Sequence, residues 1–162
     1  MEMIGNLRPA SDGEIQRLLA SPSDVTRFLY GAEADEREKL VLKKAWHAIH
    51  FVLTGSRLGG NEPLNFLVAE GTPVGEVDVG YGPARVLTSA QVRALATALS
   101  SLAPEDLAAR IDLRKLDEEV IYPGNWQRNG MGVDYVVGSY RDMRDLVVRL
   151  ADQGLGMVLY IN

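Results

Sequence analysis

The chain has 162 residues, with 17 lysines and arginines against 22 aspartates and glutamates, for a formal net charge of −5. Its 46% hydrophobic and 24% charged residues are typical of a globular protein, and the length suits one domain over residues 1–162. The absence of cysteine excludes disulfides, thiolate metal sites and cysteine nucleophiles. The acidic balance argues against a nucleic-acid binder.

The N-terminal sequence favours a cytoplasmic protein. No stretch approaches the ~18 uncharged apolar residues of a membrane span, so we expect no membrane association. Residues 1–4 lack the basic start and apolar run of a signal peptide.

The first third of the chain predicts a strand followed by helices. Residues 3–8 read as a short strand. Ser11 and Glu14 form the S-x-x-E capping box of a helix, and a second short helix is expected over residues 24–31. A long helix is expected over residues 35–53, because its apolar residues fall on one arc at 100° per residue.

Residues 56–83 hold six glycines and three prolines, which predicts a loop-rich region in which residues 63–69 can form a short helix. The connection over residues 70–83 is long for a compact domain, and loops of that length are often functional.

The C-terminal half predicts a strand over residues 84–87, a helix capped by Thr88, a short helix from Pro104 and a long helix over residues 133–153. Residues 157–161 are the best strand candidate, and the N-terminal strand is an available partner. The expected fold class is therefore α+β, with five to seven helices packed around a small sheet that includes the N- and C-terminal strands.

Standard catalytic and cofactor signatures are absent from the sequence. It has no phosphate-binding G-x-x-x-x-G-K-[ST], no G-x-S-x-G and no H-E-x-x-H, and Gly80-Tyr81-Gly82 lacks the third glycine of a dinucleotide site. We therefore expect no cofactor.

His47 and His50 are the only histidines and share a helix face at i, i+3. Such a pair could hold a metal or act as acid and base, but a third metal ligand is not evident and nearby Lys43 opposes both roles. We expect no metal site, with His50 partly buried and His47 solvated. An acid–base role for His50 stays open.

Two further groups lie near residue 120. The run Asp117-Glu118-Glu119 could work as an acid or base, although charge runs are usually solvated. Tyr122 and Trp126 flank a Pro-Gly turn and can either clamp it to the core or bind a ligand.

The segment W-H-A-I-H-F-V-L-T-G (residues 46–55), with N-E-P-L from Asn61 and L-D-E-E-V-I-Y-P-G (residues 116–124), resembles the YfbM-like family of small bacterial proteins. That resemblance implies one compact α+β domain of unknown function. Trp46, His50 and Thr54 match the family motif, whereas His47 does not.

Three functions compete. The leading hypothesis is a non-catalytic binding or interaction protein, regulatory or immunity-like, whose partner is another protein of basic charge. Its candidate binding residues are Trp46, His50, Thr54, Tyr122 and Trp126. The alternative is a small enzyme using His50 as general acid or base with Tyr122 or Glu119. In the third reading both motifs are structural, and Trp46 anchors the core.

Overall fold

The computed structural model describes residues 2–162, which form strands and helices mixed along the chain. In chain order they are β1 (Gly5–Ala10), α1 (Asp12–Ala20), α2 (Val25–Tyr30), β2 (Leu40–Lys43), α3 (Trp46–Thr54), β3 (Thr72–Pro73), β4 (Arg85–Leu87), α4 (Ser89–Ser100), α5 (Pro104–Arg110), α6 (Leu113–Glu118), α7 (Gly132–Gln153) and β5 (Gly156–Ile161). Short 3-10 helices cover Pro22–Asp24 and Ala34–Glu36. The predicted α+β class is confirmed.

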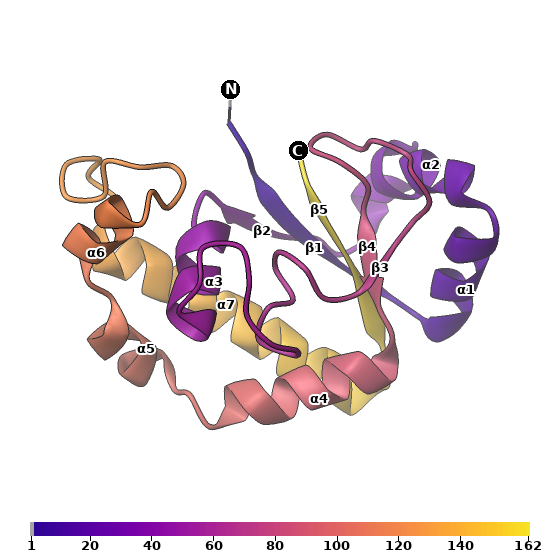
Figure 1. The fold of residues 1–162 in the computed structure, drawn as a ribbon. Coiled ribbons are helices and arrows are strands. Elements are labelled where there is room, and N and C mark those ends of the chain that lie inside the picture. The colour runs from indigo at the N-terminus through magenta and orange to yellow at the C-terminus, as the bar shows by residue number, and fades with distance from the viewer. Residues whose placement is uncertain (1) are drawn as a thin grey trace.

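The strands form one antiparallel sheet in the order β2-β1-β5-β4-β3. Its centre is the pair β1 and β5, which runs in unbroken register from Gly5 opposite Ile161 to Ala10 opposite Gly156. The start of β1 and the end of β5 therefore lie side by side (Figure 1), and the backbone N–H of Ile4 donates to the carbonyl of Asn162 at 2.8 Å.

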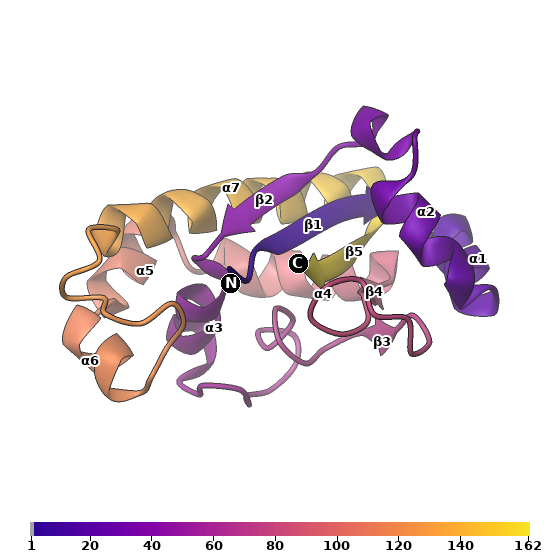
Figure 2. The same cartoon turned by 90° about the horizontal axis from the view of Figure 1, so that it is seen from above.

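The two faces of the sheet are covered by different parts of the chain. Side chains alternate along a strand, so Leu7 and Leu159 face the main core with α3, α4 and α7, whereas Val158 and Tyr160 face a smaller core with α1 and α2. Figure 1 shows these two helix groups on different sides of the strands. In Figure 2, α6 lies beside α3, at the far end of the molecule from α1 and α2.

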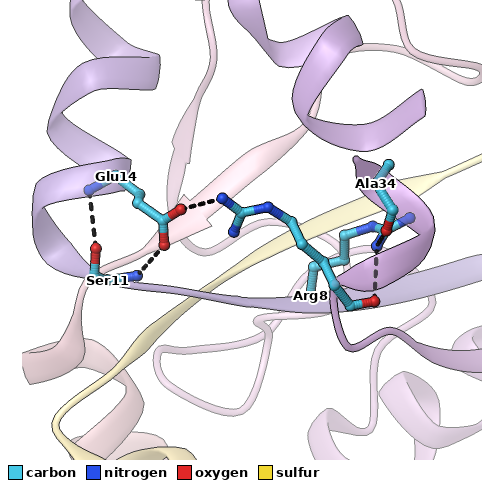
Figure 3. A network of polar contacts seen from close by, with 5 residues as sticks. Arg8, Ser11, Glu14 and Ala34 are labelled. Atoms are coloured by element: carbon cyan, nitrogen blue, oxygen red, sulfur yellow. Dashed lines mark hydrogen bonds and ion pairs between the residues drawn. The ribbon is translucent and has the colours of Figure 1, made fainter. Parts of the chain in front are cut away.

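A polar network fixes the start of α1 against β1 (Figure 3). The Ser11 hydroxyl accepts from the N–H of Glu14 and the Glu14 carboxylate accepts from the N–H of Ser11, both at 3.1 Å, so the predicted capping box is confirmed. The same carboxylate pairs with Arg37. The buried guanidinium of Arg8 donates to the carbonyl of Ala34 at 2.8 Å, which ties the segment after α2 to the sheet.

The long helix expected over residues 35–53 is wrong in its first half. Residues 40–43 form the edge strand β2, in which buried Leu42 follows exposed Val41, and within the expected range only residues 46–53 are α-helical. The spacing of 100° per residue had placed both Val41 and Leu42 on the apolar face of the expected helix. Pairing with β1, where Asn6 lies opposite Val41, outweighs the local helical pattern.

Two smaller differences concern short segments. Residues 63–69 form successive turns and not the expected helix, while α6 had no predicted counterpart. Among the helices of residues 2–162, none combines the length and apolar character needed to cross a membrane.

The close approach of backbone at Gly156 gives a stability prediction. A Cβ there would lie 2.3 Å from the carbonyl oxygen of Leu87 and 2.7 Å from Ile15. We expect Gly156→Ala to lower the free energy of unfolding by about 1–3 kcal/mol, because the central strands must shift. Gly138→Ala in α7 is the control: an added Cβ meets nothing within 4 Å, so it should gain about 0.5–1 kcal/mol. Urea denaturation measures both, and an unchanged midpoint for Gly156→Ala would contradict the packing described.

Candidate functional site

Helix α3 carries most of the sequence-predicted site residues. It begins at Trp46 and ends at Gly55, whose φ of 72° gives the left-handed C-cap, with its N–H donating to the carbonyl of Phe51 at 2.7 Å. Trp46, His47 and His50 are all buried.

Trp46 and Tyr122 together hold the backbone just before β1. Their rings stack with centroids 5.8 Å apart. The indole N–H of Trp46 donates to the carbonyl of Met3 at 3.0 Å, and the Tyr122 hydroxyl accepts from the N–H of Met3 at 2.8 Å. A Cβ on Gly5 would lie 2.9 Å from that of Trp46. The two aromatic residues thus fix where the first strand enters the sheet.

His47 links two loops and is not the solvated residue that the sequence predicted. Its Nδ1 accepts from the backbone N–H of Tyr122 at 2.8 Å, so the proton is on Nε2, which donates to the carbonyl of Arg57 at 2.8 Å. Burial lowers the pKa of His47, although the hydrogen bond to Arg57 opposes that shift. Since both ring nitrogens are used by backbone groups, His47 is buried as a structural link.

His50 is fully buried and lies one turn further along α3. Its Nε2 is 3.4 Å from the hydroxyl oxygen of Thr54, while its Nδ1 has no hydrogen-bond partner among residues 2–162. Burial, followed by electrostatic coupling to the neighbouring His47 ring, lowers the pKa of His50 to about 4. The imidazole is therefore neutral at ordinary pH. Thr54 itself donates to the carbonyl of His50 at 2.9 Å.

The remaining predicted residues lie around α6. Trp126 is buried, with its indole N–H donating to the carbonyl of Ile121 at 3.0 Å and its backbone N–H to Asp117 at 2.6 Å. Glu119 forms an ion pair with Lys115 at 3.2 Å. Within the described chain, no hydrogen bond joins Glu119 to His50 or Tyr122.

A small cleft opens beside Trp46, and most of its residues were not singled out from the sequence. Its volume is about 180 Å³. The lining is mainly apolar, with one arginine, one asparagine and two tyrosines. It consists of Gly5, Asn6, Leu7, Leu42, Trp46, Leu58, Leu67, Val68, Tyr81, Pro83, Arg85, Leu159, Tyr160 and Ile161. At its rim, Leu58 and Tyr81 are 59% and 41% exposed, which leaves the cleft open to solvent.

Arg85 is the one charged side chain that lines this cleft. It lies on β4 opposite Leu159, and its Nη1 donates to the carbonyl of Phe66 at 2.9 Å and to that of Glu70. Its Nε and Nη2 have no acceptor among the described residues. Burial lowers the pKa of Arg85 to about 10, so the guanidinium is still a cation at neutral pH. The only sequence signal was a lone arginine at the start of an apolar strand.

Three buried polar side chains lie in the same region of the fold. Within residues 2–162, one atom of each is buried without a hydrogen-bond partner: Nδ1 of His50, Oδ1 of Asn65 and Oε2 of Glu70. Burial and the charge of Glu62 raise the pKa of Glu70, and Arg85 opposes that shift. The core next to the cleft is therefore unusually polar.

A larger groove of about 500 Å³ lies between α1, α2 and the 3-10 helix after them. Its lining holds three arginines and three carboxylates, of which Arg37 pairs with Glu14, and Arg27 with Asp24 at 3.6 Å. Because both signs alternate along its walls, the groove favours no particular ligand charge. No group of three or more possible metal ligands occurs in residues 2–162.

Comparison with known proteins first defines the fold. The structure matches a crystal structure titled a protein of unknown function YfbM from Escherichia coli, with a TM-score of 0.74 and 23% identity over 98% of this chain and 99% of that one. The family described as a domain of unknown function (DUF1877) matches residues 1–160, so the chain belongs to that family. The expected resemblance is thereby confirmed. No curated protein matches the sequence significantly.

The buried histidine makes stability depend on pH. The pKa of His50 is about 4 in the folded chain, against about 6.5 when unfolded, so the folded state binds fewer protons. The contribution of His50 to the free energy of unfolding is fully present above pH ~6.5. As the pH falls toward 4, the free energy of unfolding falls by roughly 3 kcal/mol in total. We expect His50→Gln to flatten this dependence in urea unfolding measured between pH 4.5 and 7.5.

An NMR titration of the wild-type chain tests the same prediction and does not depend on the folding of a variant. In the wild-type chain, the imidazole C–H resonances of His50 should not shift between pH 5 and 8. A midpoint near pH 6.5 would show that the side chain reaches solvent.

Proposed function

We propose that this protein is a non-catalytic binding domain and that its ligand enters the cleft beside Trp46. The observation that carries the proposal is the cleft itself. It combines apolar walls with one arginine, Arg85, whose Nε and Nη2 have no hydrogen-bond acceptor among the described residues. Concave, mostly apolar sites with few polar groups are typical of small-ligand binding. Meanwhile Tyr122 and Trp126 are engaged in fixing backbone segments.

Both rims of the cleft are held in place before any ligand arrives, which supports the proposal. The loop that carries Leu58 is fixed by His47 through the carbonyl of Arg57. The loop that carries Tyr81 is fixed by Asp78, whose carboxylate accepts from the N–H groups of Gly80 and Gly82 at 2.9 and 3.0 Å. A preformed site loses less conformational entropy on binding than a mobile one.

The partner in this proposal is either a small molecule or a chain segment of another protein, in the cytoplasm of a bacterium. The net charge of −5 would speed association with a basic protein and disfavours nucleic acid. The cleft volume of about 180 Å³ is small beside the ~300–1,000 Å³ of drug-sized sites. One side chain or one chain end of a partner protein would fill it.

The unpartnered Nδ1 of His50 favours a second candidate, a small enzyme in which His50 acts as general base. With the pKa of His50 at about 4, the ring would be in its basic form at neutral pH. This candidate requires a substrate to reach a side chain that is 0% exposed. Tyr122 and Glu119, its proposed assistants, would also have to leave their present partners.

Binding can be tested with a library of small fragments, followed by ¹H–¹⁵N chemical shifts of the whole chain. We expect saturable shifts at the cleft, and fragments recovered unchanged. Tyr81→Ala should weaken binding about tenfold, since it removes a large part of the apolar rim. Leu19→Ala is the control, because Leu19 is 36% exposed on α1 and does not line the cleft. Chemical-shift changes that are the same in the Tyr81→Ala variant would argue against the proposal. Chemical conversion of a fragment would argue against it too.

A further inference from the structure

We propose that the cleft selects a monovalent carboxylate attached to one apolar or aromatic group, with Arg85 binding the carboxylate and Trp46 and Tyr81 packing against the apolar part. This inference rests on the proposed function and adds the chemical class of the ligand. It follows from the N–H groups of Arg85 that have no acceptor in the described chain, from the fixed orientation of its guanidinium and from the size of the cleft.

Arg85 forms no direct ion pair with another side chain of residues 2–162. Glu70 is the nearby carboxyl group, but it offers Arg85 its backbone carbonyl, and its carboxyl Oε2 is unpartnered. Burial raises the pKa of Glu70 and lowers that of Arg85, and the attraction between the two charges opposes both shifts. Because Arg85 is largely removed from water and forms no direct ion pair, its remaining N–H groups attract an anion more strongly than those of an exposed arginine do.

The guanidinium is also held in a defined orientation. Two carbonyls, those of Phe66 and Glu70, accept from Nη1 and so fix the plane of the group. Nη2 and Nε are then the pair of donors left over, on one edge of that plane. Parallel donors on one edge of an arginine match the two oxygens of a carboxylate.

The remaining walls limit what is attached to that carboxylate. They are apolar apart from Asn6 and the tyrosines, and the Asn6 amide already donates to Ile4 and Asn162. A volume of about 180 Å³ admits one ring or branched chain and not a nucleotide. With a single cation present, a singly charged carboxylate fits better than a doubly charged phosphate monoester.

The test compares matched probes with the full-length protein by chemical-shift titration. Phenylacetate should bind at least tenfold more tightly than phenylacetamide, because a charge-assisted pair replaces a neutral hydrogen bond. Phenylacetate should also bind more tightly than phenyl phosphate. Equal binding of acid and amide would overturn the carboxylate inference while leaving the binding function standing. If neither binds at the cleft, both proposals fail.

Variants of Arg85 assign the preference to this residue. Arg85→Gln should remove the preference for the acid, and Arg85→Lys should restore only part of it, since lysine keeps the charge and loses the paired donors. Because Arg85 also holds two carbonyls, thermal unfolding is measured alongside. If a variant does not fold, the acid–amide ratio in the wild-type chain and its decline with added salt decide the question.

Two sources of such a carboxylate exist, a free acid and the C-terminal residue of a peptide. Acetyl-Ala-Phe as free acid and as C-terminal amide separates them. A peptide acid that binds more tightly than phenylacetate would identify a chain end as the ligand. A peptide acid that fails to bind where phenylacetate binds would identify a free acid. Either result supports the class, whereas amide forms that bind as well as acids contradict it.

Discussion

The pairing of β1 with β5 is the interaction on which the rest of the structure depends. These two strands form the centre of the sheet, and every other strand is added outward from them. They pass between the two cores, so their alternating side chains decide which helices cover which face. Gly5 and Gly156 permit this arrangement, since a Cβ at either position would collide with Trp46 or with the carbonyl of Leu87.

Helix α3 connects that sheet to the loops around the cleft. Through Trp46 it holds the residues before β1, and through His47 it holds the segments at Arg57 and Tyr122. His47, which the sequence had suggested to be solvated, thus has the clearest structural role. The cleft is bounded by segments that these contacts keep in place, which explains how loops rich in glycine can form a defined site.

Much of the fold could be predicted from the sequence because local signals agreed with the tertiary structure. The capping boxes at Ser11 and Thr88 and the apolar strand at residues 157–161 are strong signals of that kind. The strand β2 was missed because its pairing partner is more than thirty residues away and its apolar residues also fit a helix. Arg85 was missed for a related reason: nothing local distinguishes an arginine that ends up beside the carbonyls of residues 66 and 70.

The placement of β1 and β5 has a consequence for how the chain acquires its structure during synthesis. The central hydrogen-bond ladder joins residue 5 to residue 161, so it cannot form until residues 156–161 have left the ribosome. Helices such as α1 can form earlier from local contacts, but the sheet that both cores need has no centre until then. The first strand of the sheet therefore waits for its central partner until residues 156–161 have emerged, and this pairing of high sequence separation should slow folding.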